Sequence, residues 1–239
     1  EGINPDSIYF LSFADDNQKY SYAASFGVAD ISDVKAMQLR PLLKNFQSFS
    51  VREKSALNIV KKITGKNGVC HIDPTLLLKK DEWQKISVKK IDKPYILVFN
   101  VKPVKSLIDF AEKLSKKTGI PVVYITDNPQ KKRKNFTYVS APTVEEFLGY
   151  FANADYTVTN SFHGTAFSVI FHKNMFVEYE TAKGFNHRAK NLLQTIGINR
   201  EIKDGEAVTT DIDWNKVDNI LQAERKLSLD YLKDIIKGE

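Results

Sequence analysis

Residues 153–171 read NADYTVTNSFHGTAFSVIF and combine a strand pattern, a turn and a helix pattern in one short stretch. The β-branched run over residues 156–159 is typical of a short strand. From Gly164 onward apolar side chains recur at helical spacing, and Ser161 at the junction is a residue type that caps helix N-termini. We therefore expect His163 in the first turn of a helix, among free backbone N–H groups at the positive end of the helix dipole. Such a position is suited to hold an anion.

The same alternation of strand and helix patterns extends along nearly the whole chain. It predicts an α/β fold, with parallel Rossmann-type sheets that are covered by helices on both faces. The predicted strands are residues 8–13, 20–24, 49–51, 69–72, 95–100, 122–125, 137–139, 156–159 and 175–179. The predicted helices are residues 33–45, 53–63, 104–118, 144–153, 164–171, 186–196 and 214–236.

A lysine-rich stretch over residues 83–93 is the best candidate for a domain boundary. The chain after it holds a fairly complete Rossmann-like set of elements, whereas the chain before it holds about half of one. We therefore predict a partial N-terminal Rossmann-like domain over residues 1–85 and a C-terminal one over residues 86–213. Residues 214–239 form a final helix.

The composition favours an ordinary globular protein of the cytoplasm. Hydrophobic residues make up 42% of the chain and charged residues 27%, and no apolar run approaches the ~18 residues that a membrane span needs. The single cysteine, Cys70, cannot form an internal disulfide, and no cluster of ligand residues predicts a metal site. The formal charge of +6 favours anionic partners. We expect no nucleic acid among them, because no nucleic-acid-binding module is recognisable.

The basic run at residues 131–134 has two interpretations. Its side chains can touch phosphates or an acidic membrane surface. Alternatively, it is a solvated loop after residues 127–129, which is the usual role of a charge run.

Two residues stand at the ends of predicted strands, where open α/β sheets bind ligands. Arg52 can hold a carboxylate or phosphate through two parallel hydrogen bonds, or it can pair with Glu53 or another acid. His163 can donate or accept a proton near neutral pH, and the neighbouring Gly164 would let a ligand approach the backbone closely. A lone histidine is, however, more often structural than catalytic.

Two further segments carry polar residues that invite a functional interpretation. Arg188 follows Asn186, a plausible N-cap, and can reach a ligand from the first turn of a helix or pair with an acid. Cys70 and His71 suggest a nucleophile, but neighbours in a strand point to opposite faces, so we interpret residues 70–75 as a structural turn. Dinucleotide-binding, phosphate-loop and serine-hydrolase motifs are absent from the sequence, which argues against those enzyme classes.

Together these segments resemble the polysaccharide pyruvyl transferase family. NADYTVTNSFHGTAFSVIFHKNMF contains Ser-Phe-His-Gly, which in the family follows a strand and begins a helix. Further segments resemble family blocks in the expected order, so the resemblance spans nearly the whole chain: YFLSFADDNQKYSYAASFG, FSVREKSAL, HIDPTLLL, TVEEFLGYFANAD and NHRAKNLLQTIG. The family's Gly-Ser-Asp-x-x-Trp block, normally just upstream of YFLSF, is absent, so we expect an incomplete N-terminal domain in this chain.

The resemblance implies a GT-B-like fold, in which two Rossmann-like domains face each other across a cleft and the final helix packs back toward the N-terminal domain. It implies that His163 is the catalytic residue and that Arg52 holds the donor. The other residues expected at the substrate site are Ser161, Phe162, Gly164 and Arg188. Some family members have an arginine where this chain has Phe162, so one donor contact is either missing or supplied from elsewhere.

The implied reaction moves a pyruvyl group from phosphoenolpyruvate to a sugar of a cell-surface glycan or its precursor, and forms a pyruvate ketal. Phosphoenolpyruvate is the donor substrate, and neither a cofactor nor a metal is expected. The acceptor is a sugar or a lipid-linked oligosaccharide, which implies peripheral contact with the inner face of the membrane. Two alternatives remain: a GT-B glycosyltransferase that uses a nucleotide sugar, and a non-catalytic domain that binds anionic glycans.

Overall fold

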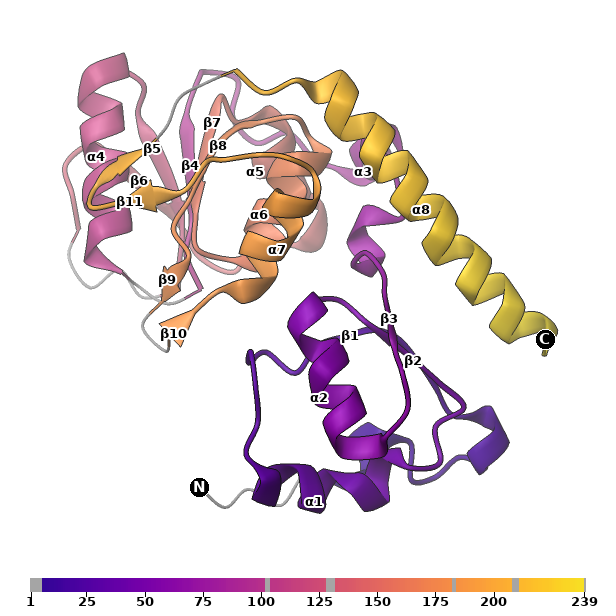
Figure 1. The fold of residues 1–239 in the computed structure, drawn as a ribbon. Helices are drawn as coiled ribbons and strands as arrows, with labels where there is room; N and C mark the ends of the chain where they lie inside the picture. Colours follow the sequence, from indigo (N-terminus) through magenta and orange to yellow (C-terminus); the bar gives the residue numbers. More distant parts are fainter. Residues whose placement is uncertain (1–5, 102–103, 128–131, 182–183, 208–210, 239) are drawn as a thin grey trace. The chain divides into compact units, whose positions relative to one another are not determined.

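The computed structural model describes residues 6–101, 104–127, 132–181, 184–207 and 211–238 (Figure 1). These residues form two compact units. Unit 1 contains the residues up to Leu77 together with those from Asn219 onward, and unit 2 contains Leu78–Asp218.

Unit 2 is built on a five-stranded parallel sheet with the strand order β6-β5-β4-β7-β8. The strands are β4 (Ile96–Phe99), β5 (Val122–Ile125), β6 (Phe136–Val139), β7 (Tyr156–Thr159) and β8 (Asn174–Val177). From the central strand β4 the chain builds one half of the sheet and then crosses to β7 on the other side. The strand order therefore reverses between β4 and β7, and ligands of open α/β sheets bind at the carboxyl ends of the strands at such a point.

Helices cover both faces of this sheet: α4 lies on one face, and α5 and α6 lie on the other (Figure 1). The helices of unit 2 are α3 (Lys80–Ile86), α4 (Lys105–Thr118), α5 (Val144–Asn153), α6 (Phe162–Ile170) and α7 (His187–Thr195). Two short antiparallel pairs follow the main sheet, β9 (Glu180–Thr181) with β10 (Gly184–Phe185) and β11 (Ile202–Lys203) with β12 (Glu206–Ala207). Ile96, Leu97 and Val98 are completely buried, as expected for a strand that is covered on both faces.

Unit 1 contains a three-stranded parallel sheet with the order β1-β2-β3. Its strands are β1 (Tyr20–Ala24), β2 (Ser48–Val51) and β3 (Val69–Cys70), and its helices are α1 (Asp33–Leu43), α2 (Lys54–Thr64) and most of α8 (Trp214–Lys237). Short 3-10 helices occupy Ser7–Phe10, Asp16–Gln18 and Pro74–Leu76. The Tyr231 hydroxyl of α8 donates a hydrogen bond to the Ser21 carbonyl at 2.9 Å and is hydrogen-bonded to Ser48 Oγ at 2.7 Å. These bonds attach α8 to β1 and β2.

The predicted parallel α/β architecture is confirmed, with errors at the level of elements. The short strands β9 to β12 and the 3-10 helices at Asp16–Gln18 and Pro74–Leu76 were not predicted. The strand predicted over residues 8–13 is wrong: Asp6 accepts a hydrogen bond from the Ile8 amide at 3.1 Å and starts a 3-10 helix. Helix α3 was missed because it lies at the edge of the lysine-rich stretch. Its first turn is capped by Glu82, which accepts from the Lys79 amide at 2.7 Å.

Among the helices of the described ranges, none has the length and apolar character that crossing a membrane requires.

Candidate functional site

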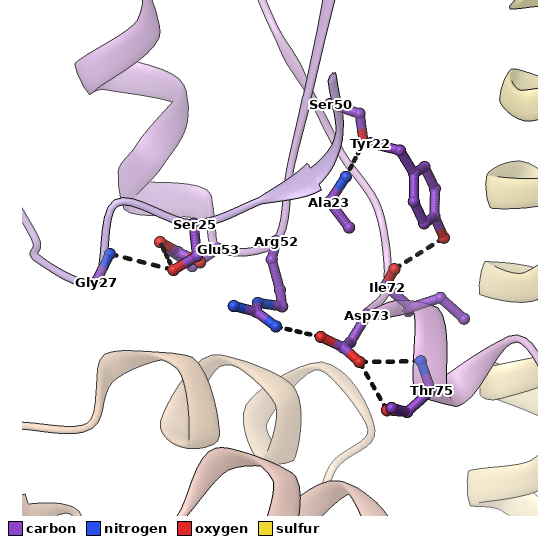
Figure 2. Close-up of polar contacts among 10 residues, drawn as sticks. All are labelled: Tyr22, Ala23, Ser25, Gly27, Ser50, Arg52, Glu53, Ile72, Asp73 and Thr75. Carbon is purple, nitrogen blue, oxygen red and sulfur yellow. Dashed lines mark hydrogen bonds and ion pairs between the residues drawn. The ribbon is translucent and has the colours of Figure 1, made fainter. Parts of the chain in front are cut away.

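In unit 1 the carboxyl ends of β2 and β3 are joined by an ion pair between Arg52 and Asp73 (Figure 2). Arg52 directly follows β2, and its Nη1 atom donates to Asp73 Oδ2. The Arg52 side chain is 15% exposed and the Asp73 side chain 2%, so the pair is largely shielded from water. Asp73 Oδ1 also accepts hydrogen bonds from the Thr75 amide at 2.9 Å and the Thr75 hydroxyl at 2.7 Å. The guanidinium is thus held by a carboxylate that is itself fixed in place.

The Asp73 carboxyl is kept ionised by its hydrogen bonds. Burial raises its pKa, but the bonds from the Thr75 hydroxyl and amide and from Arg52 outweigh burial, so the pKa lies below its usual value. The sequence left open whether Arg52 pairs with an acid, and the structure shows that it does. The partner is Asp73 rather than Glu53, whose buried carboxylate accepts from Ser25 Oγ at 2.8 Å (Figure 2). A guanidinium group carries five N–H donors, so the ion pair with Asp73 is compatible with ligand binding by Arg52. The role of Arg52 in holding the donor stays a prediction.

Cys70 and His71 have the surroundings of structural residues. Burial raises the pKa of the Cys70 thiol, which disfavours the reactive thiolate. His71 Nδ1 is hydrogen-bonded to Ser50 Oγ at 2.8 Å, but Ser50 is completely buried and its Oγ also accepts from the Ala23 amide at 3.0 Å. The His71 ring packs 4.7 Å from the Tyr231 ring between centroids, and burial lowers the pKa of this imidazole.

In unit 2, His163 lies in the first turn of α6, directly beyond the carboxyl end of β7. Ser161 caps the helix, because its Oγ accepts from the Gly164 amide at 3.3 Å. His163 is exposed, whereas Ser161 and Phe162 are buried. The His163 and Phe162 rings meet edge to face with their centroids 5.3 Å apart. The helix starts at Phe162, two positions before the predicted residue 164.

Gly164 is buried against the ends of β4 and β7. A Cβ atom at this position would lie 2.3 Å from Thr159 Oγ1 and 3.2 Å from Phe99 Cδ1. The missing side chain therefore allows α6 to pack against the sheet. From the sequence, we expected glycine here because it would let a ligand approach the backbone. The structure shows another reason, which is the close packing of α6 against the sheet.

The N-terminus of α7 is fixed beside that of α6. Asn186 caps α7 by accepting from the Ala189 amide at 3.2 Å, and its Nδ2 atom donates to the Asn160 carbonyl at 2.9 Å. Arg188, in the first turn of α7, places its Cζ atom 5.7 Å from the centroid of the Phe162 ring, within cation–π range. The guanidinium group of Arg188 thus lies over the ring of Phe162.

Sequence reasoning missed Glu178, which directly follows β8. The side chain is 6% exposed; its Oε1 atom accepts from Ser106 Oγ at 2.5 Å, and its Oε2 atom has no hydrogen-bond partner among the residues that the structure describes. Burial raises the pKa of this carboxyl above its usual value, although the hydrogen bond from Ser106 opposes the shift. A charged residue directly after an apolar strand was the available signal, and the same kind of signal singled out Arg52.

A cavity of about 650 Å³ lies in unit 2 at the carboxyl ends of β4 and β5, beside the N-terminus of α5. The described residues that line it are Trp83, Phe99, Asn100, Val101, Ile125, Thr126, Asp127, Ala141, Pro142, Thr143, Val144, Phe147, Leu148 and Phe167. This cavity was not predicted from the sequence, because its walls come from segments that are far apart in the chain.

Two other expectations concern metals and the basic run. Within the described part of the chain, no group of three or more histidine, cysteine or acidic side chains is placed to hold a metal ion. Residue 131 lies outside the described residues. Arg133 forms ion pairs with Asp109, at 2.6 Å, and with Glu112, so part of the basic run is engaged within unit 2.

The model of the polysaccharide pyruvyl transferase family matches residues 2–179. The chain belongs to this family. The resemblance seen in the sequence is therefore confirmed, and the family is one of transferases. The match includes Arg52 and His163, whereas Arg188 lies beyond its end.

Solved structures show the fold. The Methanocaldococcus jannaschii UDP-GlcNAc 2-epimerase in complex with UDP-GlcNAc and UDP has a TM-score of 0.50 at 11% identity, over 84% of this chain and 68% of that one. A second structure of that enzyme has a TM-score of 0.47 at 13% identity, over 85% of this chain and 62% of that one. UDP-N-acetylglucosamine 2-epimerase from Rickettsia bellii has a TM-score of 0.44 at 10% identity, over 90% of this chain and 68% of that one. The first likeness, with the parallel sheets, confirms a GT-B-like fold. The curated proteins include no significant match.

Proposed function

We propose that this protein transfers a pyruvyl group from phosphoenolpyruvate to a sugar of a cell-surface glycan or its precursor and forms a pyruvate ketal. The observation that carries the proposal, in a chain of this family, is the pairing of the α6 and α7 N-termini. His163 lies in the first turn of one helix, and Arg188 extends from the first turn of the other over Phe162.

This arrangement has the charge that the donor requires. Phosphoenolpyruvate carries a phosphate and a carboxylate, and helix N-termini and guanidinium groups are suitable partners for both. We assign Arg188 to the donor as the arginine contact that Phe162 cannot make. Arg52 is assigned to the donor by its place in the family pattern, and its ion pair with Asp73 limits the side-chain freedom that would be lost on binding. Ser161 supports the site by capping α6.

The proposed reaction starts with protonation of the methylene carbon of phosphoenolpyruvate by His163, which makes C2 electrophilic. A sugar hydroxyl then forms an O–C2 bond and returns its proton to the His163 imidazole. A second hydroxyl of the same sugar forms the other O–C2 bond while the C2–O bond to phosphate breaks, and its proton leaves with the phosphate. The products are a cyclic ketal and inorganic phosphate, so the reaction needs neither an oxidant nor a reductant.

The proposed reaction has two partners, a donor and an acceptor. Phosphoenolpyruvate serves as a substrate, so the proposed reaction calls for no cofactor. The acceptor is a sugar or a lipid-linked oligosaccharide, and in the second case the protein works in the cytoplasm in peripheral contact with the inner face of the membrane. The net charge of +6 favours approach to an anionic membrane surface.

The test is to incubate the full-length protein with phosphoenolpyruvate and a panel of glycan acceptors and to measure phosphate release and product mass. We expect acceptor-dependent phosphate release and a product that is heavier by one pyruvylidene group. Nucleotide release from a nucleotide sugar, without phosphate release from phosphoenolpyruvate, would identify a glycosyltransferase instead. Salt-sensitive glycan binding without turnover of either donor would identify a binding domain.

A further inference from the structure

The cavity at the carboxyl ends of β4 and β5 lies wholly within unit 2 and has aromatic walls. The Trp83 and Phe167 rings meet edge to face with centroids 5.4 Å apart, and Phe99 meets Phe147 in the same way at 5.0 Å. Phe147 also meets Phe167 edge to face, at 5.8 Å. These contacts fix the four rings relative to one another, so the cavity is preformed and offers rigid apolar surface to a ligand.

Three polar residues of the cavity lie at the strand ends, and a fourth, Thr143, is the N-cap of α5. Asn100 follows β4, whereas Thr126 and Asp127 follow β5. Asp127 Oδ1 accepts hydrogen bonds from Ser140 Oγ at 3.1 Å and from the Ala141 amide at 3.2 Å, which orients its carboxylate. An ionised carboxylate has about four acceptor sites, so the oriented Asp127 can also accept from ligand hydroxyl groups.

The charge of the cavity selects against the proposed donor. Among its described lining residues the one charged side chain is acidic, Asp127. The acidic residue Glu145 in the first turn of α5 also offsets the positive end of that helix, whereas Glu146 is paired with Lys90 at 2.6 Å. A dianion such as phosphoenolpyruvate would be repelled here, whereas a neutral ring that carries hydroxyl groups would not.

We propose that this cavity binds a neutral pyranose ring of the acceptor glycan, an assignment that rests on the proposed function. The apolar C–H faces of the ring pack on the aromatic walls, and its hydroxyl groups donate to Asp127 and Asn100. About 650 Å³ is enough for one sugar ring and part of a second, because ligand pockets of drug-sized molecules have volumes of this order.

The cavity adjoins the start of α6. Phe167 lines it and follows His163 by one helical turn, so the two side chains lie on the same face of α6. Phe99, which also lines it, packs against Gly164. A sugar ring in the cavity is therefore held beside the helix end that carries the proposed acid.

Intrinsic fluorescence gives a direct binding test, because the chain has two tryptophans and one of them, Trp83, lines the cavity. The other, Trp214, stacks on His172 elsewhere, and Trp214→Phe makes Trp83 the sole indole. This variant of the 239-residue chain is titrated with methyl galactopyranoside, methyl mannopyranoside and methyl N-acetylglucosaminide. Uridine and inorganic phosphate represent the other ligand classes. We expect a saturable change in Trp83 emission with at least one glycoside and none with phosphate.

A matched pair of variants localises the binding. Val144 lines the cavity, lies in the first turn of α5 and is 67% exposed, so Val144→Arg obstructs the cavity without disturbing the core. Val34 lies in the first turn of α1 in unit 1 and is 61% exposed, so Val34→Arg adds the same charge elsewhere. We expect glycoside affinity to fall roughly tenfold or more in the first variant and to stay within about twofold of the parent in the second. Val101→Arg, at another exposed lining residue, replaces Val144→Arg if that variant does not fold.

The outcomes separate this inference from the proposed function. Glycoside binding that Val144→Arg weakens, in a protein that does not turn over phosphoenolpyruvate, would support the sugar site and refute the pyruvyl transfer. Turnover of phosphoenolpyruvate with no glycoside response at Trp83, or with glycoside affinity unchanged by Val144→Arg, would overturn the sugar site and leave the transfer standing. A saturable response to uridine without one to glycosides would also overturn it, because the cavity would then be a nucleoside site.

Discussion

His163 is exposed at the first turn of α6, so its side chain can be changed without loss of core packing. His163→Gln keeps a hydrogen-bonding side chain but removes the transferable proton. We expect a normal circular dichroism spectrum and phosphate release that is ~10²- to 10⁴-fold slower at saturating phosphoenolpyruvate. His172, just beyond the other end of α6, is the control, and His172→Gln should keep most of the activity. Turnover within a few-fold of wild type in His163→Gln would remove His163 from the acid role.

Substitution of Arg52 tests whether donor binding needs the planar guanidinium group rather than a positive charge alone. Arg52→Lys should weaken binding of phosphoenolpyruvate, because an ammonium group cannot make two parallel hydrogen bonds. The loss of one charge-assisted bond is worth ~1.5–3 kcal/mol, or roughly 10- to 150-fold in affinity. Titration calorimetry measures it, with Arg40→Lys in α1 as the control. An unchanged dissociation constant for the Arg52 variant would contradict the assignment.

The Arg52–Asp73 pair makes the stability of unit 1 depend on pH in a defined direction. Because the folded-state pKa of Asp73 is depressed, its contribution is present above the unfolded-state value of about 4 and is lost as pH falls through the lower folded-state value. Asp73→Asn should lower the free energy of unfolding by about 3 kcal/mol at pH 7, since it leaves a largely buried guanidinium without its counter-ion. Urea denaturation should show this difference shrink as pH is lowered below about 4. A difference that does not vary with pH would exclude an ionic origin.

Arg52 and His163 were recognisable in the sequence because each stands close behind an apolar strand pattern. The partner of Arg52 was not, because Asp73 is 21 positions away and the two meet only through the parallel pairing of β2 and β3. The position of Arg188 over Phe162 was equally hidden, because it depends on the bond between Asn186 and Asn160.

At the scale of elements, the contact between α6 and the sheet depends on Gly164. Gly164→Ala would push a methyl group against Thr159 and Phe99, and overpacking of this kind costs about 1–3 kcal/mol. Urea denaturation should show this loss, and Gln194→Ala on the exposed side of α7 should change stability by less than about 0.5 kcal/mol. A Gly164→Ala variant as stable as wild type would mean that α6 can shift away from β7 without cost.

Elements whose apolar residues recur with a clear period were predicted well from the sequence. The bounds of β5, β7 and α5 agree at both ends with the prediction, because short apolar runs or a Thr143 capping box mark them. The 3-10 helix at Ser7–Phe10 was mistaken for a strand because its aromatic residues have high strand propensity, whereas the Asp6 cap decides its conformation. The short helix α3 has a lysine-rich surface, which concealed it.

At the scale of the molecule, α8 joins the two units in sequence. Its first residues belong to unit 2 and the rest to unit 1, where Tyr231 bonds to β1 and β2. Truncation after Asp218 should therefore loosen unit 1 and spare unit 2. Hydrogen exchange should become faster in β1 and β2 and stay unchanged in β4, β5 and β7. Faster exchange throughout the unit 2 sheet would show that unit 2 depends on α8 as well.

The order in which the chain is synthesised gives this division a further consequence. Unit 2 is a continuous stretch, so all of its residues have been synthesised before most of α8 has been made. Unit 1 consists of two stretches that flank unit 2, and its sheet must wait for Tyr231 to acquire its last hydrogen bonds. Domains of nascent chains generally fold in the order in which they emerge, but here the unit that emerges first is completed last. During translation the partly covered strands of unit 1 are therefore the part of this protein most in need of a chaperone.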